Sequence, residues 1–306
     1  MTSIELSSGA MRANLRPDLG GSIEGLWLGA VPVLRSCPAG ELRSVRQSAS
    51  YPLVPFSNRI AQAKLVWNGT SHPLVQNFPG EAHSIHGVGW LREWALLDGG
   101  ADWALLSLEH KADAAWPFAF DASQVFKLTG NALEMTLSIT NQSAQAAPVG
   151  LGWHPYFVKR AGSHIAFAAA GRWEMGADKL PTEHRGSPGL NTDCATLDID
   201  HCFDGWSGSV QLHDALLRTH ITSSTNKLVV FTNAQQDCIA IEPVSHVNNA
   251  INLVAANAAL ASLSGPFGGQ FNELANAHGS EQLGIKILQP GESWTQSMRI
   301  QTESSL

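Results

Sequence analysis

The sequence is short of several residue types, and each shortage excludes a class of protein. Charged residues make up 15% of the 306 residues, against about 25% in an average globular domain. Lys and Arg number 19 against 26 Asp and Glu, for a net charge of −7. The basic residues form no run, so the chain lacks the cationic patch that nucleic acid or an anionic membrane requires. We predict neither as a partner.

Cysteine is scarce and scattered, and long apolar runs are missing. The four cysteines are Cys37, Cys194, Cys202 and Cys238. None lies in a Cys-x-x-Cys pair, so we expect neither structural zinc nor a disulfide framework. No apolar stretch approaches the ~20 residues of a membrane helix, and the first residues lack the basic and apolar segments of a signal peptide. Reduced thiols and a cytoplasmic location are therefore favoured.

Short segments typical of β-strands are abundant. Residues 132–140 alternate apolar and polar side chains and end at a polar turn, and 228–232 is rich in β-branched residues. Further strands are predicted at 124–128, 163–167, 285–288 and 293–301. One helix is predicted at 249–263, which is rich in Ala and Leu. Turn signals come about every ten residues, which favours an all-β sandwich or barrel. No repeat or linker is visible, so residues 1–306 are predicted to form a single domain.

Two segments place an acid/base pair at the ends of predicted strands. Residues 152–157 read Gly-Trp-His-Pro-Tyr-Phe, with His154 held among aromatic residues. The following proline restricts His154 to extended conformations. Glu242 closes the apolar run 238–242. One group can donate a proton while the other accepts one, which is the minimum equipment for opening and reclosing a sugar ring.

Polar residues also stand in unusual settings elsewhere. Asn58 and Arg59 lie in the otherwise apolar stretch 51–60, where an arginine needs a partner or a cleft. His86 precedes a glycine, a position that allows backbone to approach a ligand. Asp200 follows a loop-like stretch. Each also has an ordinary explanation: a structural ion pair, a satisfied core histidine, and an aspartate that caps a turn.

Taken together, these segments resemble the aldose 1-epimerases, also called galactose mutarotases. The segments that carry the resemblance are Pro-Phe-Ser-Asn-Arg-Ile at 55–60, His-Gly at 86–87, Gly-Trp-Leu-Arg-Glu-Trp at 89–94, Gly-Trp-His-Pro-Tyr-Phe at 152–157, Asp-His-Cys-Phe at 200–203, Glu-Pro-Val-Ser-His at 242–246 and Leu-Gln-Pro-Gly-Glu-Ser at 288–293. They follow the family's order from about residue 50 to 295. The resemblance implies one large antiparallel β-sandwich, the galactose mutarotase-like supersandwich, in agreement with the strand pattern.

The resemblance also implies a role for each residue. His154 corresponds to the general acid that protonates the ring oxygen, and Glu242 to the general base that deprotonates the anomeric hydroxyl. Arg59, His86 and Asp200 correspond to residues that hold sugar hydroxyls, whereas Asn58 is expected to support Arg59. The product is the other anomer of a free aldose, and neither a metal nor an organic cofactor is implied.

Two further expectations concern charge and the pocket. Free His titrates near 6.5 and free Glu near 4.3, and a nearby carboxylate favours protonated histidine. We therefore expect Glu242 to be ionised and to keep His154 charged. Where the family commonly has Pro-Asp, this chain has Asn248 and Asn249, which puts the substrate more in doubt than the reaction. Any of four tryptophans could face the sugar, although core packing is favoured for each: Trp90, Trp94, Trp153 and Trp206.

Several alternatives stay open on the sequence. A hexose-6-phosphate 1-epimerase would need a cationic patch, and a sugar-binding sensor would not need an acid/base pair. A metalloenzyme would have to use histidines drawn from His83, His86, His154 and His246. The sequence leaves open whether the chain is a monomer or a homodimer. It also does not distinguish galactose, glucose, arabinose, fucose and xylose as substrates.

Overall fold

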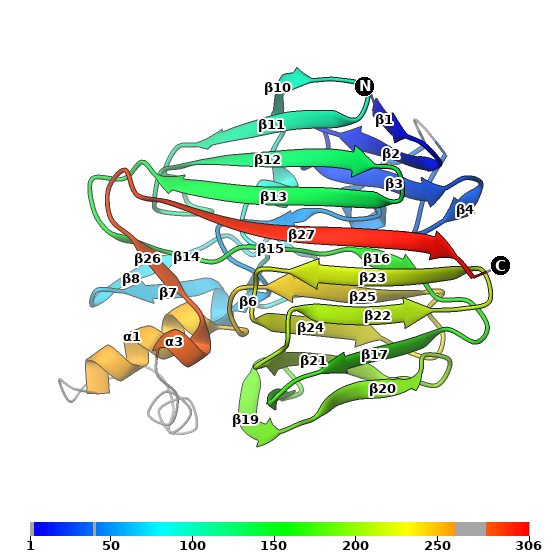
Figure 1. The fold of residues 1–306 in the computed structure, drawn as a ribbon. Coiled ribbons are helices and arrows are strands. Elements are labelled where there is room, and N and C mark those ends of the chain that lie inside the picture. Colours follow the sequence, from blue (N-terminus) through cyan, green and yellow to red (C-terminus); the bar gives the residue numbers. More distant parts are fainter. Residues whose placement is uncertain (1–2, 39–40, 261–279, 306) are drawn as a thin grey trace.

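Two large antiparallel sheets pack face to face in the computed structural model, which describes residues 3–38, 41–260 and 280–305 (Figure 1). The nine-stranded sheet has the order β10 (Ala95–Gly99), β11 (Trp103–His110), β12 (Phe120–Thr129), β13 (Ala132–Asn141), β27 (Ser293–Ser304), β23 (Leu217–Ser223), β22 (Ser209–His213), β17 (His164–Ala168) and β20 (Gly189–Asp193). The eight-stranded sheet has the order β19 (Pro181–Gly186), β18 (Gly171–Met175), β21 (Ile199–Asp204), β24 (Lys227–Thr232), β25 (Cys238–Val244), β15 (Gly152–Trp153) and β5 (Pro52–Leu53), with β16 (Tyr156–Val158) also on β25. The predicted all-β sandwich is confirmed.

Smaller elements surround these sheets. A four-stranded sheet is built from β1 (Ile4–Ser8), β2 (Met11–Arg16), β3 (Ser22–Leu28) and β4 (Val31–Pro32). Three strand pairs are β6 (Arg59–Ile60) with β9 (Ser84–Ile85), β7 (Lys64–Trp67) with β8 (Thr70–Pro73), and β14 (Ala147–Val149) with β26 (Lys286–Leu288). Among the described residues, the helices are α1 (Ala250–Leu260), α3 (Ser280–Leu283) and three 3₁₀ turns at Val45–Gln47, Ala61–Ala63 and Gly89–Leu91. In the described part of the chain, no helix is long and apolar enough to cross a membrane.

The main core fills the space between the two large sheets. Along β25, Ile239 and Ile241 point into this core, where they join Leu137 of β13 and Leu106 of β11. Burying each such side chain stabilises the fold by about 1.5–3 kcal/mol. The side chains that alternate with them, Glu242 among them, face the other side of the eight-stranded sheet. A strand that is buried on both faces can therefore carry a polar group without exposing its core.

Each predicted strand falls on an observed one, but β12 begins four residues before the predicted 124–128 and β27 ends three residues after the predicted 293–301. Residues 132–140 fall in β13, 228–232 in β24 and 163–167 mostly in β17. The predicted helix corresponds to α1, which begins at Ala250; positions 261–263 lie outside the described residues. All four cysteines are free, as the absence of a disulfide framework in the sequence predicts.

The amino-terminal segment supports one side of the structure that carries Tyr156. Arg35, which follows β4, donates its backbone N–H to the Tyr156 carbonyl oxygen at 2.7 Å. Its guanidinium carbon lies 3.8 Å from the centroid of the Tyr156 ring. The same guanidinium donates to the Ser48 carbonyl oxygen. The segment that follows β4 therefore fixes the position of Tyr156 in the eight-stranded sheet.

Candidate active site

The register of three strands brings His154 and Glu242 together. Both β15 and β16 pair with β25, with Gly152 opposite Val244 and Tyr156 opposite Ala240. His154 lies between the two short strands and therefore reaches the level of Glu242. Its Nε2 is 3.3 Å from Glu242 Oε1. Two segments about ninety residues apart in sequence thus form one pair of titratable groups.

Burial decides the charge of this pair. The His154 and Glu242 side chains are 8% and 3% exposed. Loss of solvent, together with the charge of Arg35, lowers the pKa of His154 to about 3. Loss of solvent also raises the pKa of Glu242 well above its usual value, with the charge of Asp200 adding to the effect. The expectation that Glu242 would keep His154 charged is wrong for this structure, because the cost of burying two charges exceeds the local attraction.

Aromatic rings fix the plane of the His154 imidazole. Its centroid lies 4.8 Å from that of Tyr51 and 4.5 Å from that of Tyr156. These are the two tyrosines of the whole sequence. His86 meets the same imidazole edge-on at 5.2 Å. The ring is held from several sides by packing, while His154 Nδ1 and Glu242 Oε2 are buried without a hydrogen-bond partner among the described residues.

His86 and Asn58 hold each other through their backbones. The Asn58 N–H donates to His86 Nδ1 at 3.0 Å, and the His86 N–H donates to the Asn58 carbonyl oxygen at 2.8 Å. Because Nδ1 accepts, the proton of the neutral ring is on Nε2. Burial, followed by the charges of neighbouring groups, lowers the pKa of His86 well below its usual value. His86 therefore offers an uncharged N–H donor.

Gly87 is required for this turn. Its φ is +71°, and a Cβ there would lie 2.3 Å from the Val54 carbonyl oxygen. Glycine alone fits such a position without displacing backbone. The prediction from the His-Gly dipeptide was close approach to a ligand; the structure shows close approach to the chain itself.

Arg59 is clamped between two partners. Its Nη1 donates to Asn58 Oδ1 at 3.1 Å, which is the contact expected from the sequence. Its Nε and Nη2 donate to the Glu81 carboxylate at 3.2 and 2.7 Å. This two-point contact holds the guanidinium plane at a fixed angle. Glu81 was not predicted, because a single acidic residue in a loop gives no periodicity or spacing signal.

Asp200 reaches the same pocket from another strand. It lies on β21 opposite Phe231 of β24, and Phe231 lies opposite Ala240 of β25. Its Oδ2 is 3.2 Å from the Lys179 ammonium. The carboxylate therefore arrives at the pocket already paired with a cation.

All six predicted site residues line one pocket of about 180 Å³. They are Asn58, Arg59, His86, His154, Asp200 and Glu242. The lining residues that were not predicted as site residues are Tyr51, Phe78, Glu81, Ile85, Tyr156 and Phe231. Their positions depend on strand pairing over long distances, which no local pattern in the sequence reports.

The other candidates have structural contacts elsewhere. The tryptophans Trp90, Trp94, Trp153 and Trp206 are all at most 4% exposed and do not line this pocket. His246 accepts from the Ser57 N–H through Nε2 at 2.9 Å and contacts the Val247 carbonyl oxygen through Nδ1 at 2.7 Å. Among the described residues, no cluster of three or more His, Cys, Asp or Glu side chains could hold a metal ion.

The arrangement combines a buried pair of titratable side chains with a rim of hydrogen-bonding side chains. Charged partners are balanced in pairs, and aromatic faces cover the remaining walls. Such a pocket suits a small, neutral, polyhydroxylated molecule on which a proton is added at one oxygen and removed from another.

Comparison with known proteins identifies the family of the chain. The family model described as aldose 1-epimerase matches residues 2–301. The uncharacterized protein YphB of Escherichia coli K12 is 40% identical over 174 residues, which cover 56% of this chain and 58% of that protein. The chain thus matches less than two thirds of that relative's length.

Solved structures agree over nearly the whole chain. A proposed aldose 1-epimerase of Escherichia coli K12 superposes with a TM-score of 0.83 at 27% identity, covering 99% of each chain. A galactose mutarotase-like protein of Clostridium acetobutylicum gives a TM-score of 0.79 at 19% identity, over 99% of this chain and 95% of that one. At that identity the second likeness concerns the fold alone.

Proposed function

The chain belongs to the aldose 1-epimerase family, and from this premise we propose that it interconverts the α and β anomers of a free, uncharged aldose. The observation that carries the proposal is the buried His154–Glu242 pair, 3.3 Å apart, in the wall of a pocket rimmed with hydrogen-bonding side chains. Binding alone would not need two titratable groups in direct contact. We therefore favour catalysis over a sensing role.

The proposed reaction is a pair of proton transfers around one bond cleavage. Glu242 takes the proton of the anomeric hydroxyl while His154 gives a proton to the ring oxygen. The C1–O5 bond breaks, its electrons stay on O5, and C1 becomes an aldehyde carbon. Rotation about C1–C2 exposes the other carbonyl face, and the reverse transfers close the ring. No proton is gained or lost overall.

The protonation of the His154–Glu242 pair is compatible with these roles. Because burial disfavours both the charged imidazole and the charged carboxylate, one transferable proton is shared between His154 and Glu242. The partner without this proton has a lone pair that can accept one, and the titration belongs to the pair rather than to either residue. Our assignment requires the proton on His154 when the sugar is bound. Each positioned acid or base contributes roughly 10²–10⁴-fold to a rate, so this pair suffices for a reaction that is not very slow by itself.

The charge pairing of the rim favours a neutral sugar over a sugar phosphate. Arg59 is engaged by Glu81 through 2.7 and 3.2 Å contacts, and Lys179 by Asp200 at 3.2 Å. A phosphate would have to displace one of these carboxylates and leave it without its cation. We therefore propose Arg59, His86 and Asp200 as hydroxyl-binding residues and Asn58 as the support of Arg59.

The test measures the rate of anomer exchange on freshly dissolved α-aldoses, with and without the protein. The exchange is monitored by polarimetry or by saturation-transfer proton NMR, and hexose 6-phosphates are run in parallel. We expect acceleration for at least one free aldose and none for the phosphates. Acceleration confined to the phosphates would reject the uncharged substrate. Tight binding of an aldose without any acceleration would reject the enzyme and support the sensor.

A further inference from the structure

A hairpin tip carries a cation to the edge of the proposed pocket. The tip joins β18 to β19 at residues 176–180, where the Lys179 N–H donates to the Gly176 carbonyl oxygen at 2.9 Å. Lys179 has a φ of +63°. Its ammonium lies 3.2 Å from Asp200 Oδ2, with 47% of the side chain exposed. The cation therefore stays open to solvent while it touches a pocket residue.

Two buried side chains fasten this tip from other parts of the chain. His83 Nδ1 accepts from the Gln62 N–H at 2.9 Å, so His83 Nε2 carries the proton and donates to the Asp178 carbonyl oxygen at 3.0 Å. Asn248 Nδ2 donates to the Lys179 carbonyl oxygen at 3.2 Å. His83 and Asn248 are 3% and 2% exposed. The backbone of Lys179 is thus held by groups that cannot move freely.

Asn248 is one of the two positions at which the sequence differs from the Pro-Asp that the resemblance leads us to expect. A proline there has no side-chain donor, so this contact to the tip depends on the substitution. The side chain of Asn248, at a position that put the substrate in doubt, is therefore hydrogen-bonded to Lys179, whose ammonium contacts Asp200. The substitution has a structural consequence at the pocket rim.

We propose that Lys179 is a specificity-determining residue of this pocket: its ammonium and the Asp200 carboxylate together bind a single hydroxyl of the sugar. This inference rests on the proposed function. An ammonium offers three donors and a carboxylate only acceptors, so the pair can donate to a hydroxyl oxygen and accept its proton at once. A sugar that lacks this hydroxyl leaves the pair facing solvent and gains nothing from Lys179.

The choice of hydroxyl is set by the rigidity of the tip. Because His83 and Asn248 fix the Lys179 backbone, the ammonium has a limited reach around Asp200. A hydroxyl of the opposite configuration at the same carbon would point away from the pair. The pair therefore distinguishes epimers, whereas the His154–Glu242 pair acts on the ring atoms that all aldoses share.

The test replaces Lys179 and varies the sugar. Equilibrium binding by tryptophan fluorescence and turnover by saturation-transfer NMR are measured for wild type and Lys179→Met. The sugars are the best aldose substrate and its single-deoxy analogues. We expect Kd and KM to rise about tenfold, as for one lost charge-assisted hydrogen bond, with kcat within about twofold because chemistry is untouched. For one deoxy analogue, the substitution should change neither constant.

Two variants separate the proposal from a general structural effect. Arg185→Met removes an exposed cation from the adjoining strand β19, where it pairs with Glu183 at 2.7 Å, and should leave all constants unchanged. Asn248→Ala should raise Kd in the same direction as Lys179→Met but less. In the Lys179→Met background, Asn248→Ala should cause no further rise in Kd, because both substitutions act through the same ammonium.

The outcomes are distinct. An equal rise in Kd for the parent sugar and for every deoxy analogue would overturn the role of Lys179, as would an unchanged Kd for all of them. A wild-type protein that binds an aldose without turning it over would reject the proposed epimerase. The binding constants of the variants would still decide the role of Lys179 in that case.

Discussion

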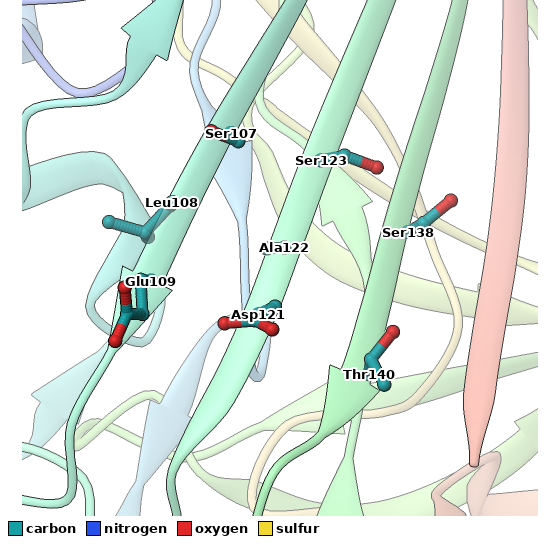
Figure 2. Close-up of a pocket in the computed structure, with 8 residues that line it drawn as sticks. All are labelled: Ser107, Leu108, Glu109, Asp121, Ala122, Ser123, Ser138 and Thr140. Atoms are coloured by element: carbon teal, nitrogen blue, oxygen red, sulfur yellow. The ribbon is translucent and has the colours of Figure 1, made fainter. Parts of the chain in front are cut away.

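The two large sheets each carry a hollow lined by polar side chains, but the hollows differ in burial. The first is the candidate active site on the eight-stranded sheet. The second lies on β11, β12 and β13 of the nine-stranded sheet, and we call it the outer groove. Figure 2 shows its eight lining residues: Ser107, Leu108, Glu109, Asp121, Ala122, Ser123, Ser138 and Thr140. Its polar side chains are half-buried or exposed.

Hydrogen bonding separates the hollows further. In and beside the outer groove, Ser138 and Thr140 each meet a hydroxyl of the neighbouring strand β27 at 2.7 Å. In the active site, His154 and Glu242 are buried and each keeps a side-chain atom without a partner in the described part of the chain. Polarity is common to both places, but burial shifts proton affinities and leaves groups available to a substrate. The comparison predicts chemistry at one sheet and none at the other.

The largest expected effect comes from removing the base. Glu242→Gln keeps the shape of the side chain but removes its ability to accept a proton, so we expect kcat to fall by about 10²–10⁴-fold. Circular dichroism and the melting temperature should show a folded protein. The matched control is Asp121→Asn in the outer groove, which makes the same chemical change and should leave kcat unchanged.

Either variant can contradict the view that burial distinguishes the active site from the outer groove. Near-normal turnover in Glu242→Gln would remove Glu242 from the base role. A comparable loss in Asp121→Asn would show that the outer groove contributes to catalysis and that burial is not the deciding property.

The next effect is expected at the acid. His154→Asn removes the transferable proton while keeping a polar side chain, and we expect a loss of about 10²-fold in kcat, at the low end of the usual range. Sugar affinity should change little, because Arg59, His86 and Asp200 remain. Equilibrium binding measures Kd and so checks the unchanged affinity, and NMR exchange measures kcat and so checks the loss of turnover. A collapse of binding with kcat preserved would make His154 a residue that holds the ligand.

A strand could be predicted from the sequence when its own residues show the alternating pattern, and could not when it forms only by pairing with distant strands. The strand β13 follows from ten residues of local alternation, and its bounds were predicted almost to the residue. The strands β5 and β15 have two residues each and exist because they pair with distant strands. Local pattern has no means to report such pairing. The sandwich was therefore predictable as a class, but the short strands that position the site were not.

The site divides in the same way. His154 and Glu242 belong to ordered motifs, so their identities were available from the sequence. Their protonation was predicted wrongly, because free-residue pKa values and a neighbouring charge omit the cost of burial. Glu81 and Tyr51 were missed because they carry no motif of their own. Motifs report which groups react, whereas the surrounding fold sets their charge.

A smaller effect is expected from the support of Arg59. Asn58 has a φ of +54°, so alanine would strain the backbone, whereas Asn58→Gly removes only the side-chain acceptor. Glu81 still holds the guanidinium by two contacts. We expect KM to rise about three- to tenfold, corresponding to roughly 1 kcal/mol, with kcat little changed.

The matched control for this substitution is Asn68→Gly. Asn68 also has a positive φ, +47°, but lies exposed in the turn between β7 and β8. Its replacement should leave KM unchanged. A loss in kcat as large as that of Glu242→Gln would instead place Asn58 against the reacting atoms.

The smallest expected effect is the response to pH across the neutral range. Burial lowers the pKa of His154 to about 3, so the pair takes up a second proton only far below the ordinary histidine value. Burial also raises the pKa of Glu242 well above its usual value, so the pair keeps its single proton as pH rises through the ordinary glutamate range. We therefore expect kcat/KM to show no acid limb at about pH 6.5, because His154 does not take up its proton in that range. An exposed pair would instead lose activity as pH falls through about 6.5, where free histidine titrates. An acid limb at that value, measured with a sugar whose own exchange rate is subtracted at each pH, would mean that solvent reaches the pair and that burial does not distinguish the two hollows.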